Sequence, residues 1–255
     1  MEGYHKKPGI KKSAMIIGRQ PIIEAIQSGR PIDKILFQRN VTGDAIGTIR
    51  QLAREQNIPI QQVPPEKLNG LTKANHQGCI AIAGLVQYLD LQQVIDHVVG
   101  AGETPLFVML DGVTDVRNIG AIARTAVCCG AQALIIPDKG VGALNEEAMK
   151  SSAGALEKIH VCRVNSLMKA VDSLHLNGIK VFAAEMTATK MVFDLPLTEP
   201  ACVIMGSEDK GVFPGLLKIC DEVFKIPMAG DFESLNVSVA AGMILYESMK
   251  HRMKG

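Results

Sequence analysis

The chain has 255 residues, of which 47% are apolar, and its formal net charge is +1 at pH 7. This length provides enough core for two modest domains or one large one, and no apolar run approaches the roughly 20 residues of a membrane span. The first residues carry lysines without an apolar segment behind them, so a signal-peptide pattern is excluded and a cytoplasmic location is expected.

Charge is unevenly distributed along the chain. Residues 1–88 contain twelve Lys or Arg and six Asp or Glu, a net charge of +6, whereas the remaining residues contain fifteen and twenty, a net charge of −5. A basic amino-terminal third is typical of a module that binds a polyanion such as RNA. A second interpretation stays open, because four of these charges are lysines within residues 1–13, which we expect to form a flexible arm.

The six cysteines stand in apolar surroundings, without a C-x-x-C motif or a Cys/His ligand spacing. We therefore expect small core residues in a reducing compartment, and no metal site. They are Cys79, Cys128, Cys129, Cys162, Cys202 and Cys220.

The first third of the chain predicts a small α/β sandwich of residues 1–88. A short helix opens at Pro21 and stops before Gly29, because proline suits the first helical turn and glycine ends a helix. Apolar patterns predict three strands, at residues 33–37, 58–63 and 79–86. Two further helices are expected at residues 45–56 and 65–71.

Residues 89–104 have a weak helical pattern that ends in two glycines, and we expect a linker there. A second alternation of strands and helices fills residues 105–255. Its continuous apolar strands predict a parallel sheet covered on both faces. The strands are expected at residues 106–110, 133–136, 159–164, 179–184, 201–205 and 223–226, and the helices at residues 118–129, 145–155, 166–176, 213–219 and 236–250.

Functional loops in a parallel sheet lie beyond the carboxyl ends of the strands. Three such loops are rich in polar residues and glycine, at residues 111–118, 206–211 and 226–236. The second loop has the glycine spacing of a phosphate loop but lacks the Lys and Ser/Thr of that motif. Elsewhere in the chain, Gly140-Val-Gly142 resembles the start of a dinucleotide-binding motif, but the third glycine of that motif is missing. Kinase, NTPase and dehydrogenase functions are therefore disfavoured.

The third loop ends at Asn236, a good helix N-cap, and the positive end of the following helix points back at the loop. This arrangement suits a small ligand or an anion. An ordinary connection between a strand and a helix explains the stretch equally well when it is taken alone.

Taken together, the three loops resemble a known family. The chain contains Asn118-x-Gly120-Ala-Ile-Ala-Arg124, then Ile204-Met-Gly206-Ser-Glu208-x-x-Gly211, then Ile226-Pro-Met228 followed by Ser234-Leu-Asn236-Val-Ser-Val-Ala. These segments are similar, in the same order, to the three motifs of the SpoU (TrmH) class of SPOUT RNA ribose 2′-O-methyltransferases. The resemblance spans roughly residues 105–250.

The amino-terminal third resembles the ribosomal-protein-like (L30e-like) RNA-binding domain of these enzymes. The similar segments are Ile17-Gly18-Arg19-Gln-Pro-Ile-Ile-Glu24-Ala and His76-Gln-Gly78. This architecture is closest to bacterial enzymes that methylate a guanosine ribose in 23S rRNA.

The resemblance implies a SPOUT domain with a trefoil knot, the cofactor S-adenosylmethionine and a homodimer. A knot departs from the rule that connections do not thread loops, and periodicity does not predict it. The cofactor would be held mainly through backbone groups and apolar contacts, by Gly206, Ile226, Met228 and Leu235.

The resemblance also implies five catalytic-site residues. Arg124 would act at the ribose and its phosphate, either as a base or, because arginine stays protonated, as a phosphate clamp that polarises the hydroxyl. Asn118 would orient Arg124 or the ribose, and Glu208 would fix its loop by accepting hydrogen bonds. Ser234 and Asn236 would place the nucleotide, and Asn236 would also cap the last helix.

The expected function is therefore S-adenosylmethionine-dependent 2′-O-methylation of guanosine in 23S rRNA, with residues 1–88 binding the RNA. Two alternatives stay open. One is a tRNA ribose 2′-O-methyltransferase, and the other is a non-catalytic RNA-binding factor in ribosome assembly.

Overall fold

The computed structural model describes residues 15–141, 144–230 and 234–253, so the arm predicted for residues 1–13 lies outside it. The chain divides into two compact units, Met1–Gln87 and Tyr88–Gly255. In the described part of the chain, no helix is long and apolar enough to cross a membrane.

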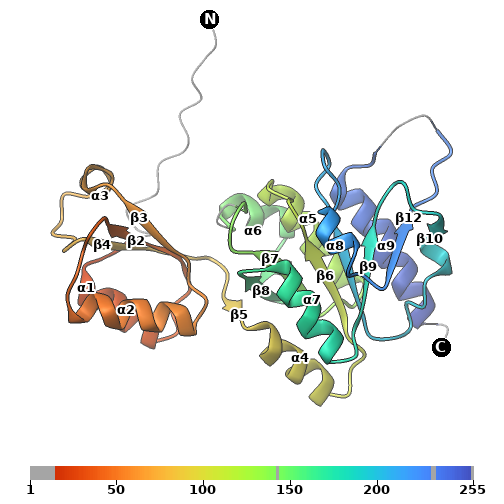
Figure 1. Ribbon diagram of the computed structural model, residues 1–255, viewed down its shortest axis with the longest axis horizontal. Coiled ribbons are helices and arrows are strands. Elements are labelled where there is room, and N and C mark those ends of the chain that lie inside the picture. Colours follow the sequence, from red (N-terminus) through yellow and green to blue (C-terminus); the bar gives the residue numbers. More distant parts are fainter. Residues whose placement is uncertain (1–14, 142–143, 231–233, 254–255) are drawn as a thin grey trace, which may run out of the picture. The chain divides into compact units, whose positions relative to one another are not determined.

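The first unit is a four-stranded sheet with helices on both faces (Figure 1). Its strand order is β1-β4-β2-β3, in which β4 is antiparallel to both neighbours and β2 and β3 are parallel. The strands are β1 (Met15–Ile17), β2 (Ile32–Gln38), β3 (Ile60–Val63) and β4 (Cys79–Ala83). The helices are α1 (Arg19–Gln27), α2 (Asp44–Glu55) and α3 (Pro65–Leu71).

Two apolar clusters hold this sheet between its helices. Buried isoleucines of α1 and α2 pack with Phe37 and Cys79 on one face, and Leu68 of α3 packs with Leu36 and Ile80 on the other. Successive strand residues point to opposite faces, which is why neighbouring residues of β2 enter different clusters.

Two details of this unit differ from the sequence prediction. The strand β1 was not predicted, because three residues carry no readable alternation; its pairing with β4 through space creates it. The helix α1 begins at Arg19, ahead of Pro21, which therefore occupies the first turn, where its missing N–H costs nothing.

The second unit is built on an eight-stranded sheet whose paired strands are all parallel. The strand order is β10-β12-β9-β11-β6-β7-β8-β5. The strands are β5 (Tyr88–Leu89), β6 (Leu106–Leu110), β7 (Ala133–Pro137), β8 (His160–Val164), β9 (Lys180–Ala184), β10 (Lys190–Met191), β11 (Ala201–Met205) and β12 (Glu222–Lys225). The predicted α/β class with a parallel carboxyl-terminal sheet is confirmed, whereas the knot stays a prediction.

Helices cover both faces of this sheet. Residues of α4, α7 and α8 share one apolar cluster with the strands, and α5 packs against α6 and α9. The helices are α4 (Leu91–Gly100), α5 (Val116–Cys128), α6 (Glu146–Ser152), α7 (Leu167–Leu176), α8 (Pro214–Leu217) and α9 (Val237–Arg252), with short 3-10 helices η2 (Ala155–Glu157) and η3 (Val192–Asp194).

The segment 89–104, predicted as a linker, is packed into the second unit. The strand β5 pairs with β8, and Leu91, Val94, Ile95 and Val98 of α4 are buried in the main apolar cluster. These four residues have the i, i+3, i+4, i+7 spacing of one helix face, and the exposed Val99 and the two glycines at the end of the segment blur this pattern. The predicted domain boundaries at residues 88 and 104 remain a prediction.

The direction of the strand order reverses between β6 and β11. On one side of β6 the sheet continues with β7 and β8. On its other side lies β11, and beyond β11 lie β9 and then β12. In open parallel sheets, ligands bind beyond the carboxyl ends of the strands near such a reversal. The loops after β6 and β11 are two of the three that the sequence selects.

Candidate active site

The loops after β6 and β11 are joined directly. The Asp111 backbone N–H donates to the Met205 carbonyl at 2.9 Å, and the Asp111 carboxylate accepts from the Phe213 N–H at 2.6 Å. These bonds continue the pairing of the two strands beyond their ends. As a result, the loop that opens α5 and the loop 206–211 form one surface.

The loop 206–211 is a tight turn. Ser207 and Gly211 exchange backbone hydrogen bonds of 2.9 and 3.2 Å, and the Ser207 hydroxyl accepts from the Lys210 N–H at 3.2 Å. A Cβ at Gly206 would overlap the backbone of Gly211 and Val212. Glycine at position 206 is therefore required by the close return of the chain.

Glu208 connects all three loops. Its Oε1 accepts a hydrogen bond from Asn236 Nδ2 at 2.7 Å, from the Val237 backbone N–H at 3.2 Å and from Asn118 Nδ2 at 3.4 Å. The two amides also contact each other, because Asn236 Nδ2 lies 3.3 Å from Asn118 Oδ1. One carboxylate thus holds the starts of α5 and α9 against the turn after β11.

The start of α9 is capped as the sequence predicts. Asn236 is the N-cap residue, and its Oδ1 accepts from the Ser238 N–H at 3.0 Å. The same oxygen accepts from the Ser238 hydroxyl at 2.6 Å. Glu208 beside this helix start also places a negative charge at the positive end of the helix, a favourable arrangement.

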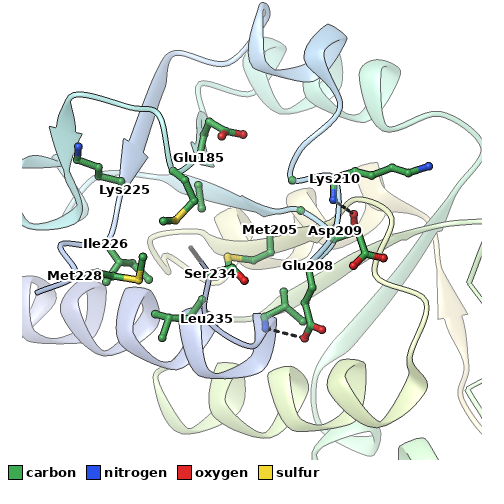
Figure 2. Close-up of a pocket in the computed structure, with 17 residues that line it drawn as sticks. Glu185, Met205, Glu208, Asp209, Lys210, Lys225, Ile226, Met228, Ser234 and Leu235 are labelled. Atoms are coloured by element: carbon green, nitrogen blue, oxygen red, sulfur yellow. Dashed lines mark hydrogen bonds between the residues drawn. The ribbon is translucent and has the colours of Figure 1, made fainter. Parts of the chain in front are cut away.

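A cavity of about 370 Å³ lies between the ends of β9, β11 and β12 and the start of α9. Figure 2 shows Ile226, Met228 and Leu235 along one side, with Met205 and Ser234 in the middle. All four predicted cofactor residues line it, together with two of the predicted catalytic residues: Gly206, Glu208, Ile226, Met228, Ser234 and Leu235. The loop 226–236 is therefore part of a cavity wall as well as a connection.

A smaller pocket of about 120 Å³ adjoins this cavity. Ser207, Glu208, Asp209 and Val237 line both, and Asn118 lines the smaller pocket only. The two hollows therefore meet at the Glu208 network. Two reactants can be brought into contact only where their binding sites adjoin.

Comparison with known proteins agrees with this geometry. Residues 105–246 match the model of the SpoU rRNA Methylase family, and residues 15–89 match a model described as RNA 2′-O ribose methyltransferase substrate binding. The chain belongs to the SpoU family. It is accordingly an RNA methyltransferase of the SpoU/TrmH type, in which a substrate-binding domain precedes the methylase domain.

Individual relatives of the SpoU family cover almost the whole chain. A protein named "Putative TrmH family tRNA/rRNA methyltransferase" from Staphylococcus haemolyticus is 37% identical over 93% of this chain and 96% of its own length. YacO of Bacillus subtilis, with the same description, is 33% identical over 93% and 95%. The crystal structure of the SpoU methyltransferase AviRb from Streptomyces viridochromogenes, in complex with AdoMet, superposes with a TM-score of 0.60 at 28% identity, covering 94% of this chain and 91% of AviRb.

Arg124 lies apart from this SpoU site. It is exposed on α5 and lines neither hollow, and among the described residues it has no hydrogen-bond or ion-pair partner. Asn118, six residues earlier, contacts Glu208 and Asn236 instead of orienting Arg124. Residues six apart lie on different faces of a helix, so the two side chains point in different directions.

The sequence analysis missed three residues that line the cavity, two of them charged. Glu185 and Met186 follow β9, and Lys225 ends β12. The loop after β9 lacks the glycines that drew attention to the other three loops. Its position at the carboxyl end of a parallel strand was the signal that could have identified it.

The cysteines are free thiols, and only some are core residues. Cys79, Cys162 and Cys202 are buried as predicted, whereas Cys128 is exposed near the end of α5. Cys128 is the last residue of the helix, and Ala126, two residues earlier, is buried. Among the described residues, no group of three or more potential ligands is placed to hold a metal ion.

Proposed function

We propose that this protein transfers a methyl group from S-adenosylmethionine to the 2′-hydroxyl of a guanosine in 23S rRNA. The observation that carries the proposal is the Glu208 network, which joins the three family motifs where two hollows meet. We further propose that the protein acts in the cytoplasm and that residues 1–88 bind the RNA.

The larger cavity suits the cofactor. Its volume of about 370 Å³ lies within the usual range for small-molecule sites. Ile226, Met228 and Leu235 offer an apolar wall for a flat adenine, and the Gly206 loop offers backbone groups. The AdoMet complex of AviRb supports this assignment. When bound, the cofactor supplies a methyl group that its sulfonium already activates.

The residues of this chain supply alignment. Glu208 holds Asn118 and Asn236 where the two hollows meet, and Ser234 lines the larger cavity. We assign the smaller pocket to the acceptor ribose. Arg124 would clamp the neighbouring phosphate and polarise the 2′-hydroxyl, because an arginine remains protonated at ordinary pH. Positioning of this kind supplies much of a rate enhancement.

A homodimer accounts for the distance of Arg124 from the cavity that its own chain provides. In a pair of chains, Arg124 of one protomer can serve the cavity of the other. An exposed apolar stripe on α9 supports the dimer: Val239, Met243 and Tyr246 are 48%, 46% and 58% exposed, at the i, i+4, i+7 spacing of one helix face. The helix α9 packs directly against α5, which carries Arg124.

RNA binding by the first unit is supported by its charge of +6 and by the match to a substrate-binding domain. The relatives are described as acting on tRNA or rRNA. The preference for a guanosine in 23S rRNA comes from the two-domain architecture.

The test is incubation of the protein with methyl-labelled S-adenosylmethionine and unmodified 23S rRNA, followed by nucleoside analysis. Label on the ribose of a guanosine is the expected result. In a parallel reaction with unmodified tRNA, label on the tRNA ribose without label on 23S rRNA would make tRNA the substrate. Absence of cofactor binding by calorimetry would favour the non-catalytic assembly factor.

The substitution Arg124→Ala separates chemistry from cofactor binding. We expect methyl transfer to fall by at least about a thousandfold, since a positioned charge at a reacting group is worth several kcal/mol, while the Kd for the cofactor stays within about twofold. Arg124→Lys is the matched control, which keeps the charge but loses the planar fork and should retain partial activity. Equal loss of binding and transfer would contradict the role given to Arg124.

A further inference from the structure

Glu185 lines the larger cavity. It follows β9 directly, and β9 pairs with both β11 and β12. Its backbone N–H donates to the Phe224 carbonyl at 2.8 Å, and its carbonyl accepts from the Ala188 N–H at 3.2 Å. The backbone of Glu185 is therefore fixed by the sheet and by a turn.

The carboxylate of Glu185 lies against the turn after β11. Its Oε2 is 3.0 Å from the position that a Cβ of Gly211 would occupy, and Gly211 has a φ of +64°. The residue is half-buried, and among the described residues its side chain has no hydrogen-bond or ion-pair partner. A partly desolvated carboxylate without a donor is unfavourable unless a ligand provides one.

The other side-chain acceptors of the cavity are exposed or already engaged. Glu208 is exposed and accepts three hydrogen bonds at Oε1, and the Ser207 hydroxyl accepts from Lys210. Asp209 and Ser234 are exposed, so water reaches their side chains. Among the described carboxylates that line the cavity, Glu185 is the half-buried one without a hydrogen-bond donor.

We propose that the Glu185 carboxylate accepts the ribose hydroxyls of the cofactor and sets the affinity for it. This inference rests on the proposed function. Two vicinal hydroxyls match the two oxygens of one carboxylate, the same chemistry by which an acidic residue after a strand holds the ribose of a dinucleotide. Figure 2 shows Glu185 across the cavity from Ile226, Met228 and Leu235, where the adenine would lie.

The test uses the full-length protein and isothermal titration with three ligands. They are S-adenosylhomocysteine, 5′-methylthioadenosine, which keeps the ribose but lacks the amino-acid end, and the 2′-deoxy form of S-adenosylhomocysteine. We expect Glu185→Gln to raise the Kd of S-adenosylhomocysteine by about tenfold or more, as the loss of a charge-assisted hydrogen bond implies. The Kd of 5′-methylthioadenosine should rise by the same factor. For the 2′-deoxy ligand, the difference in Kd between wild type and variant should be clearly smaller.

The outcomes separate the alternatives. A penalty with S-adenosylhomocysteine but none with methylthioadenosine would assign Glu185 to the ammonium group and overturn the proposal, and so would equal binding by wild type and variant. Asp209→Asn is the matched control, because it removes the same charge from the same cavity; an equal loss there would mean a general effect of charge. If the wild type binds none of the ligands, the proposed function fails rather than this assignment.

Discussion

Glu208 is the residue on which the site depends most. It is a surface carboxylate in a polar turn when the sequence is considered locally, and such residues contribute little to stability. In the structure it accepts from two side-chain amides and one backbone N–H of other loops. Its effect should therefore be on the geometry of the site more than on folding.

The substitution Glu208→Gln tests this. The carboxamide oxygen can take the place of Oε1, to which all three donors point. The substitution removes the negative charge that strengthens these three hydrogen bonds. We expect the stability to fall by only about 0.5–1.5 kcal/mol, while methyl transfer falls by about a hundredfold or more. Thermal unfolding and single-turnover transfer measure the two effects. A loss of stability that by itself explains the loss of activity would contradict this view.

The thiols provide a second residue-scale prediction. Burial raises the pKa of Cys79 to about 11 and that of Cys162 to about 12, so both remain protonated at pH 8 and are shielded from reagents. Cys128 is exposed. Iodoacetamide at pH 8 should therefore label Cys128 first, as read by mass spectrometry. Labelling of Cys79 at a similar rate in the native protein would be inconsistent with its burial.

At the scale of elements, α9 is attached at both ends. Its first turn is held by Glu208 and by the Asn236 cap. Near its end, the Arg252 guanidinium donates to the carbonyls of Thr104, Pro105, Leu197 and Glu199 at 2.7–2.9 Å. Burial lowers the pKa of Arg252 from its ordinary value, and four carbonyl acceptors compensate for its desolvation. The helix is thus a rigid element whose exposed apolar stripe is available for assembly.

The substitution Met243→Glu places a charge in the middle of that stripe. We expect a monomer by light scattering, because a buried unpaired carboxylate in a dimer interface is strongly unfavourable. Methyl transfer should be lost, while cofactor binding persists. Val99→Glu is the control: Val99 is 52% exposed on α4, a different helix. If the Met243→Glu protein remains dimeric, α9 is not part of the dimer interface.

At the scale of the whole molecule, the two units have separate cores. The described apolar clusters of the first unit contain residues 16–82, and the main cluster of the second contains residues 91–216. Each unit buries its own apolar residues and can fold by itself. The methylase unit holds both hollows of the site, and the first unit carries the basic charge.

Residues 88–255 expressed alone should therefore fold and bind S-adenosylmethionine with the affinity of the full chain. Binding to 23S rRNA should weaken by about tenfold or more and lose much of its salt dependence, because fewer phosphates are neutralised. Calorimetry and filter binding at two salt concentrations measure these quantities. Undiminished RNA binding by the fragment would mean that the first unit is not the RNA-binding module.

The sequence by itself determined the α/β class, most helices and strands, and the three motif loops, because these depend on local periodicity, on caps such as Asn236 and on glycine positions. The tertiary structure decided features that depend on neighbours in space. The strand β1 exists only through its pairing with β4. The helix α4, predicted as part of a linker, joins the core because the sheet offers a surface for its four apolar side chains. Glu185 and Lys225 enter the cavity because the strand order sets β9 between β11 and β12. Strand pairing over long sequence separations decides which strand ends lie side by side. The spacing of residues within one segment does not predict this pairing.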